Sequence, residues 1–192
     1  MSKTRTLLID VARRLFADKG YANTTMNDIA ETSGKGRRTV YTYFKSKNEI
    51  YLAVIKSESD ALYARYKEIV QKDLPPEEKL VNYVFVRLEA VKELVERNGS
   101  LRAEFFQNIR NVEQARRDID NKEICLLYAI LEEGVEKGAF RIPSIRATAA
   151  IMHYAIKGME VPYIRGNFSE LGVDTSRLKE YILDFVLYGI KK

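Results

Sequence analysis

Helical periodicity runs through nearly the whole chain and limits its fold more than any other feature. Only four prolines and ten glycines interrupt 192 residues, and long stretches repeat with a period near 3.6. The first predicted helix spans residues 3–19, and its apolar residues share one face: Leu8, Val11, Ala12, Leu15 and Phe16. We therefore expect an all-α protein of about nine helices.

The excess positive charge of the chain lies in its first quarter. Residues 1–50 hold ten basic and five acidic residues, whereas residues 51–192 hold 22 of each sign. This asymmetry favours a head that binds a polyanion, attached to a neutral body. A basic surface that is simply solvated is the alternative reading of charge alone.

Residues 25–50 predict two short helices followed by the start of a long one. Thr25 and Asp28 have the spacing of a capping box at the start of the second helix, and Gly34 ends that helix at a tight turn. The third helix is predicted over residues 37–44. A second capping box over residues 46–49 opens a long helix that ends near Asp73. This arrangement matches a helix-turn-helix.

The third helix has the properties of an element that enters a DNA groove. Val40 and Phe44 are four residues apart and can anchor it to the core. The outward positions are then Arg37, Arg38, Tyr41, Thr42 and Lys45. Arginines at the start of such a helix suit guanine edges or phosphates in a major groove about 12 Å wide. The starts of the second and fourth helices suit phosphates.

Residues 5–52 contain a long ordered motif, which reads Ala12…Leu15-Phe16…Gly20-Tyr21…Thr24-Thr25-Met26…Asp28-Ile29-Ala30…Gly34…Thr39-Val40-Tyr41-Thr42-Tyr43-Phe44-Lys45-Ser46-Lys47…Ile50. This motif resembles the DNA-binding signature of the TetR family. The resemblance implies that Thr25, Tyr41 and Lys47 hold phosphates, and that Thr39 and Thr42 lie on the recognition helix.

The sequence departs from this signature at Lys35 and Gly36, where the family has an apolar residue and a serine cap. The added charge is expected to strengthen phosphate binding, and it leaves open how much of the affinity depends on base sequence. The complete predicted DNA-binding set is Thr25, Lys35, Arg37, Arg38, Thr39, Tyr41, Thr42 and Lys47. We expect the helix-turn-helix domain to span residues 1–50, and an effector-binding and dimerisation domain to span residues 51–192.

The predicted body contains helices at about 76–97, 101–110, 113–137, 145–165 and 176–190. The last two are apolar over most of their circumference, which predicts burial on more than one side. We expect a two-fold homodimer built on them, as in TetR-like proteins, and a single thick monomer core is the alternative. The predicted interface residues are Ile151, Met152, Met159, Tyr181, Ile182, Phe185 and Val186.

An effector pocket is predicted among the middle helices, because TetR-like regulators usually bind a small molecule there. Its apolar character favours a lipophilic ligand. The candidate lining residues, which plain core packing also explains, are Phe85, Phe105, Phe106, Tyr128 and Tyr154.

No catalytic motif supports an enzyme. His153 falls on a polar stripe, which predicts a surface position, and it has no neighbouring residues at metal-ligand spacing, so neither a metal nor a cofactor is expected. The lone Cys125 and the absence of a signal peptide or of a membrane-spanning run favour the cytoplasm. The resulting prediction is a regulator, expected to be a repressor, that binds a palindromic DNA operator as a homodimer and is released by an effector. A helical interaction protein without sequence-specific DNA binding is the alternative.

Overall fold

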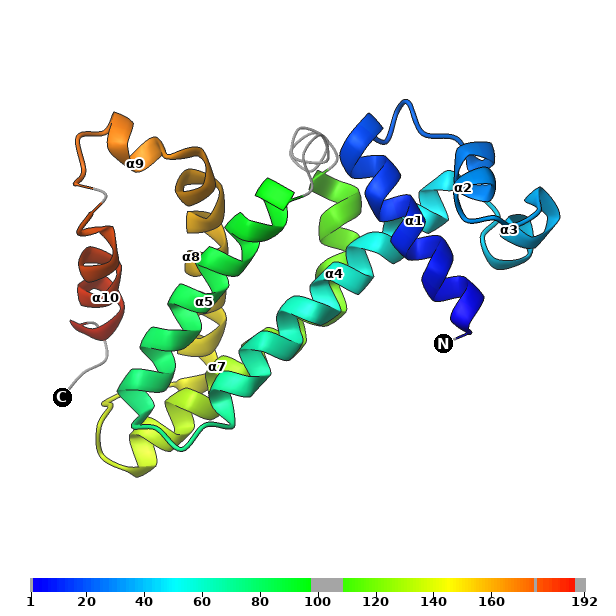
Figure 1. Ribbon diagram of the computed structural model, residues 1–192. Helices are drawn as coiled ribbons and strands as arrows, with labels where there is room; N and C mark the ends of the chain where they lie inside the picture. The colour runs from blue at the N-terminus through cyan, green and yellow to red at the C-terminus, as the bar shows by residue number, and fades with distance from the viewer. Residues whose placement is uncertain (1, 98–108, 175, 189–192) are drawn as a thin grey trace. The chain divides into compact units, whose positions relative to one another are not determined.

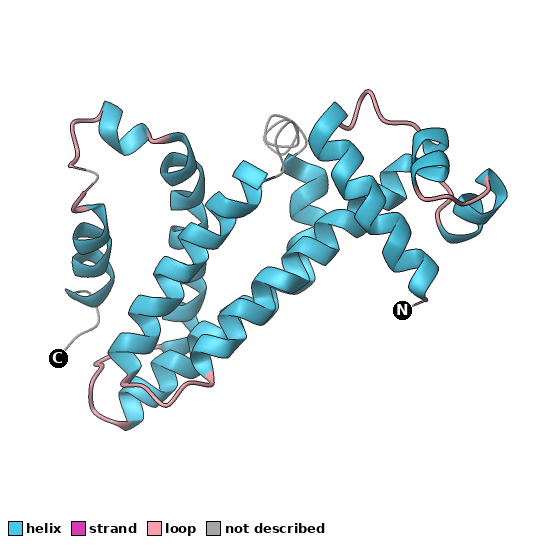
Figure 2. Cartoon of the chain, viewed as in Figure 1, coloured by secondary structure: helices cyan, strands magenta, loops and turns pink. Residues whose placement is uncertain are grey.

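The computed structural model describes residues 2–97, 109–174 and 176–188, and their regular secondary structure is helical, with no strand (Figures 1 and 2). Within that part of the chain, no helix is long and apolar enough to cross a membrane. The helices are α1 (Lys3–Lys19), α2 (Met26–Thr32), α3 (Arg37–Tyr43), α4 (Lys47–Val70), α5 (Pro76–Arg97), α7 (Ile109–Glu136), α8 (Ile145–Arg165), α9 (Asn167–Glu170) and α10 (Leu178–Tyr188).

Most predicted helices appear within a few residues of their expected bounds. The predicted helix over 101–110 falls almost wholly outside the described residues. The one-turn helix α9 was not expected; it follows Gly166, whose backbone is left-handed with φ of 73° and so ends α8. Helix α10 begins later than predicted because Ser176 donates hydrogen bonds from its backbone and its hydroxyl to Asp174 Oδ1, which forms a turn before the helix.

Two compact units make up the chain. One comprises residues 1–60 with 93–117, and the other comprises residues 61–92 with 118–192. We call residues 2–60 the head and the described residues of the second unit the body. The predicted boundary at residue 50 falls inside α4, which contributes residues to both units.

The head is organised around one apolar core. α1 contributes Leu8 and Phe16, α2 contributes Ile29, and α3 contributes Val40, all of them fully buried. The α1–α2 connection turns at Gly20, whose φ of 84° is a conformation that glycine adopts at low cost. Because α1, α2 and α3 all contribute to this core, the core fixes the orientation of α3 within the head.

The body core is apolar along α5 and α7 but also encloses charged side chains. Leu80 and Leu88 of α5 and Leu127 of α7 are fully buried, as is Arg87 of α5. The Arg87 guanidinium pairs with Glu123 of α7 and with Glu160 of α8, at 2.8 Å for Glu160. These two pairs show that α5, α7 and α8 pack together in the body.

Candidate nucleic-acid interface and body site

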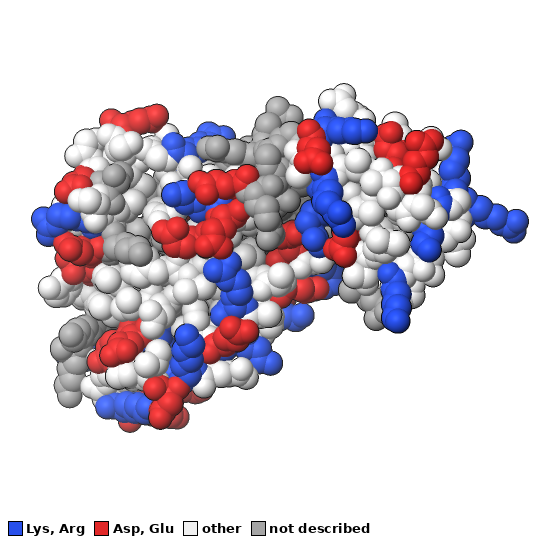
Figure 3. Space-filling view, in the orientation of Figure 1, with Lys and Arg blue, Asp and Glu red and all other residues white. Residues whose placement is uncertain are grey.

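Helix α3 presents the predicted polar face to solvent. Its anchor Val40 is fully buried, and Phe44, directly after the helix, is 2% exposed. Arg37, Arg38 and Thr42 are exposed on the other side. Figure 3 shows Lys and Arg side chains projecting from the end of the head where Figure 1 places α3. The orientation that the helical spacing predicts is therefore the one that the structure has.

The side chains of this face differ in the contacts that they make with the rest of the protein. Within the described residues, neither the Arg37 nor the Arg38 guanidinium forms a hydrogen bond or an ion pair. Tyr41 is 45% exposed. Thr42 donates its hydroxyl proton to the Arg38 carbonyl at 2.9 Å, and the residue is exposed. Thr39 is half-buried. The two cations at the helix start can thus reach an anion without breaking a bond to the described residues.

The N-terminal segment supports α3 in a way that the sequence analysis missed. Ser2 donates a hydrogen bond from its hydroxyl to the Tyr43 hydroxyl at 3.1 Å, and the Arg5 guanidinium lies 5.0 Å from the centre of the Phe44 ring. These contacts join residues about 40 positions apart. Both tie the first turn of α1 to the end of α3.

The start of α2 is capped as predicted. Thr25 accepts the Asp28 N–H at 3.1 Å, and both its N–H and its hydroxyl donate to Asp28 Oδ2 at 2.7 Å. These hydrogen bonds, that of the side chain first, lower the pKa of Asp28. The Thr25 hydroxyl proton is thus already donated within the head, although the side chain is exposed.

Lys47 is tied more closely to the head than a free phosphate ligand would be. Its ammonium donates to the carbonyls of Tyr21 at 2.7 Å and Ala22 at 3.3 Å and lies 4.3 Å from the centre of the Tyr21 ring. Two of its three N–H groups are used in this way, so one remains for a phosphate. Lys35 is half-buried in the turn before α3.

Residues 8–54 match the family model described as bacterial regulatory proteins, tetR family. The HTH-type transcriptional repressor KstR2 of Mycolicibacterium smegmatis is 31% identical over 147 residues, which cover 71% of this chain and 67% of that repressor. The chain belongs to the TetR family. It is a helix-turn-helix transcriptional regulator and not an enzyme.

Solved structures of other transcriptional regulators share this fold. A transcriptional regulator from Cytophaga hutchinsonii superposes with a TM-score of 0.74 at 23% identity, covering 97% of this chain and 98% of that one. FadR from Bacillus subtilis in complex with stearoyl-CoA gives a TM-score of 0.69 at 21% identity, covering 96% and 98%.

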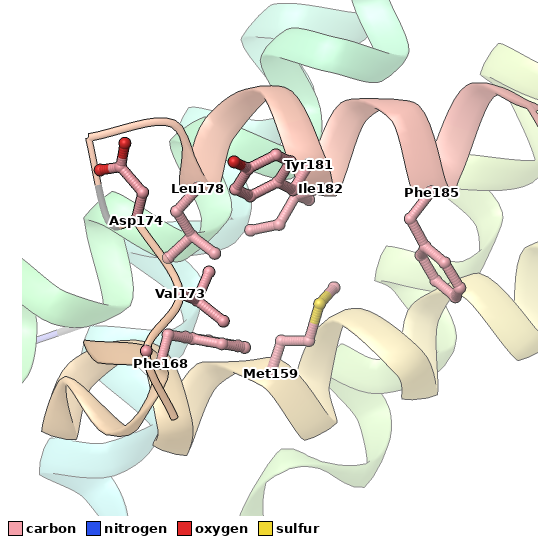
Figure 4. Close-up of a pocket in the computed structure, with 9 residues that line it drawn as sticks. Met159, Phe168, Val173, Asp174, Leu178, Tyr181, Ile182 and Phe185 are labelled. Carbon is pink, nitrogen blue, oxygen red and sulfur yellow. The ribbon is translucent and has the colours of Figure 1, made fainter. Parts of the chain in front are cut away.

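A cavity in the body of this TetR-family protein lies between α8, α9 and α10 (Figure 4). Its volume is about 600 Å³, and its lining is mostly apolar. The side chains come from Met159 of α8, from Phe168 of α9 and from Leu178, Tyr181, Ile182 and Phe185 of α10, with Gly172, Val173 and Asp174 between these last two helices.

The predicted pocket residues do not line this cavity. Tyr154 is 59% exposed in the single chain. Phe85 is half-buried, and Tyr128 donates its hydroxyl to Glu132 at 3.0 Å. Phe105 and Phe106 lie outside the described residues. Helical spacing indicated apolar faces here, but it could not show which of them border a cavity.

The predicted interface residues divide into two groups. Ile151, Tyr181 and Phe185 are 68%, 40% and 71% exposed in the single chain. Ile182 and Val186 are buried against their own chain, and Met152 and Met159 are half-buried. The two faces of α10 therefore differ: one packs on the body and the other is outward.

The buried charges of the body correct the prediction for His153. This residue is fully buried, not on the surface, and Asp120 and Glu123 of α7 lie beside it. Burial opposes the charge of Arg87, but Glu160 and Glu123 outweigh that effect and raise its pKa. The residues that different helices contribute to the cluster lie 30 or more positions apart, so sequence spacing gave no signal of it.

Proposed function

We propose that this chain is a repressor that binds a palindromic operator as a homodimer and that a small lipophilic effector releases it. The observation that carries the DNA-binding part is the orientation of α3, with Val40 buried and Arg37 and Arg38 exposed. Two such helices related by a two-fold axis read inverted half-sites one helical turn, or a small multiple of it, apart.

Selection of bound fragments from the source genome tests the DNA-binding proposal. A dimer that neutralises about eight phosphates gives a log–log salt dependence with a slope of roughly −7. We expect Arg38→Ala to cost about 1–3 kcal/mol at one base position and to relax preference there. The control Arg141→Ala removes the same charge from an exposed loop of the body. A flat salt response, or no preferred fragment, favours the helical interaction protein.

An outward apolar surface supports the homodimer. Five large apolar side chains of α8 and α10 are exposed in the single chain: Ile151, Tyr154, Tyr181, Phe185 and Tyr188. Several large apolar side chains exposed on two helices support an interface. We expect Phe185→Glu to give monomers in sedimentation experiments and to abolish tight operator binding. Glu180→Gln, on the exposed polar side of the same helix, is the control and leaves the dimer intact.

The cavity between α8 and α10 supports the effector. Its volume is within the range of about 300–1,000 Å³ that small-molecule sites have. Tyr181 and Phe185 belong both to its lining and to the exposed apolar surface, so an occupant would contact the surface on which the second copy docks. Release requires that the effector bind the DNA-free arrangement more tightly.

Lipophilic probes test this part of the proposal. FadR of Bacillus subtilis was solved with stearoyl-CoA, so stearoyl-CoA and stearate are the first probes. We expect one of them to lower operator affinity, and Val173→Trp, which fills the cavity, to remove that response while operator binding persists. If the probe still releases Val173→Trp from the operator, the effector does not bind in this cavity.

A further inference from the structure

His153 stands in an unusual position for a histidine. Its side chain is fully buried, and neither ring nitrogen has a hydrogen-bond partner among the residues that the structure describes. Both nitrogens face acidic oxygens: Nε2 is 3.4 Å from Asp120 Oδ1, and Nδ1 is 3.6 Å from Glu123 Oε2. A buried imidazole without hydrogen bonds costs free energy, so the arrangement needs a further stabilising partner.

The spacing of these three side chains suits a metal ion. One potential ligand atom from each lies within 4.8 Å of the other two. Asp120 and Glu123 are three residues apart on α7 and therefore share a face, which the packing of α8 brings to His153. Two ligands of a tetrahedral ion with bonds of about 2.1 Å are about 3.4 Å apart, which is the distance between His153 Nε2 and Asp120 Oδ1.

The surrounding charges favour an additional cation. The cluster contains three carboxylates, those of Asp120, Glu123 and Glu160, and two cationic side chains, Arg87 and Lys157. Lys157 pairs with Asp120 Oδ2 at 2.8 Å, which leaves Oδ1 on the side of the imidazole. Among the described residues, carboxylates thus outnumber cationic side chains in this cluster. Buried carboxylates pair with cations or coordinate metal ions.

We propose that Asp120, Glu123 and His153 bind one divalent first-row transition-metal ion in the body of each chain. One imidazole nitrogen and two carboxylates form a mixed nitrogen and oxygen set that suits zinc, iron or nickel better than calcium or magnesium. Three protein ligands leave a coordination position for water. The site lies outside the effector cavity and uses none of its lining residues.

Metal titration of the full-length protein tests the proposal. Because His153 is the only histidine of the chain, the protein must be produced without a polyhistidine tag. After treatment with EDTA, we expect one Zn²⁺ per chain, a rise in the unfolding temperature and, with Co²⁺, visible absorption bands. Binding of metal to the folded state alone produces that rise.

Two variants and one control locate the ion. We expect His153→Asn and Asp120→Asn each to weaken Zn²⁺ binding by at least about tenfold, since even outer-shell changes cost that much. Glu132→Gln, on α7 but hydrogen-bonded to Tyr128 instead of the cluster, is the control and binds as the unaltered chain does. Unchanged affinity in His153→Asn overturns the proposal, as does a chain that binds no metal.

Nuclear magnetic resonance of the unaltered protein gives an answer that does not depend on the folding of a variant. With ¹⁵N-labelled histidine, the single imidazole gives one pair of ring nitrogen signals. We expect the signal of one ring nitrogen to shift when Zn²⁺ is added, because the nitrogen that ligates a metal carries no proton. A ring that keeps both protons with excess Zn²⁺ shows that His153 is an internal counter-ion of the carboxylates, and the metal site is then wrong.

Discussion

The head and the body place arginine in opposite environments. Arg37 and Arg38 of the head are exposed at the start of a short helix, with guanidinium groups that make no hydrogen bond or ion pair to the described residues. Arg87 of the body is fully buried between Glu123 and Glu160. The exposed arginines contribute almost nothing to the stability of the folded head, and they remain available to bind a polyanion. The buried one is committed to holding three helices together.

Exposed and buried cations are therefore expected to differ in whether their removal changes binding or stability. An exposed cation loses little solvation on folding, so its removal changes binding and leaves stability nearly unchanged. A buried cation depends on its carboxylate partners, and its removal leaves their charges without compensation. Changes to buried and to exposed side chains should therefore have effects of very different size.

Arg87→Met is expected to cause the largest loss. It removes the cation between Glu123 and Glu160, and breaking a buried pair of this kind costs about 3–5 kcal/mol. Urea unfolding followed by circular dichroism measures the change. The same substitution in the head, Arg38→Met, is expected to stay within about 0.5 kcal/mol. Adding Glu123→Gln and Glu160→Gln to Arg87→Met is expected to recover part of the lost stability. Equal losses of stability for Arg87→Met and Arg38→Met would contradict the difference proposed between the buried and the exposed arginine.

Val40→Ala is expected to weaken the head by roughly 2 kcal/mol, because it removes buried methyl groups and leaves a small cavity. Hydrogen exchange of α3 amides measures the effect locally. Thr42→Ala, on the exposed face of the same helix, is the matched control. It is expected to lower operator affinity with little change in exchange. If Val40→Ala leaves exchange unchanged, the buried anchor does not hold the helix.

Thr25→Ala is expected to cost about 1 kcal/mol, because it removes the side-chain cap of α2. Thermal unfolding monitored by circular dichroism measures that loss. Thr25→Ser keeps the hydroxyl and is expected to retain most of the stability. A role for Thr25 in phosphate binding alone predicts that both variants unfold like the unaltered chain.

Acid is expected to weaken the same cap. Hydrogen bonds from Thr25 lower the pKa of Asp28, so the charged carboxylate stabilises the folded head above the unfolded pKa of about 3.9. That contribution is lost as pH falls through the lower folded pKa, and it is constant near neutrality. A carbon-detected titration of the Asp28 carboxyl measures this pKa. In Thr25→Ala it is expected to rise towards the ordinary aspartate value, and an unchanged pKa would show that the Thr25 hydroxyl does not lower it.

Much of the helical framework follows from residues close together in the chain. α1 and α8 have their predicted bounds, and the capping box of Thr25 and Asp28 forms as its spacing indicates. The orientation of α3 follows from two apolar residues four positions apart, Val40 and Phe44. Helix periodicity and capping act within about four residues, so the sequence carries them directly.

Contacts between distant residues depend on how the helices pack. The polar stripe on α8 predicts a surface position for His153, which is wrong, because the packing of α7 places Asp120 and Glu123 against its buried ring. Likewise, Lys47 reaches the Tyr21 carbonyl, and Ile182 turns inward while Phe185 turns outward. Local patterns of residues set where helices form and which of their faces are apolar. Which helix each face contacts is decided only by the tertiary structure, because burial and side-chain pairing depend on residues far apart in the chain.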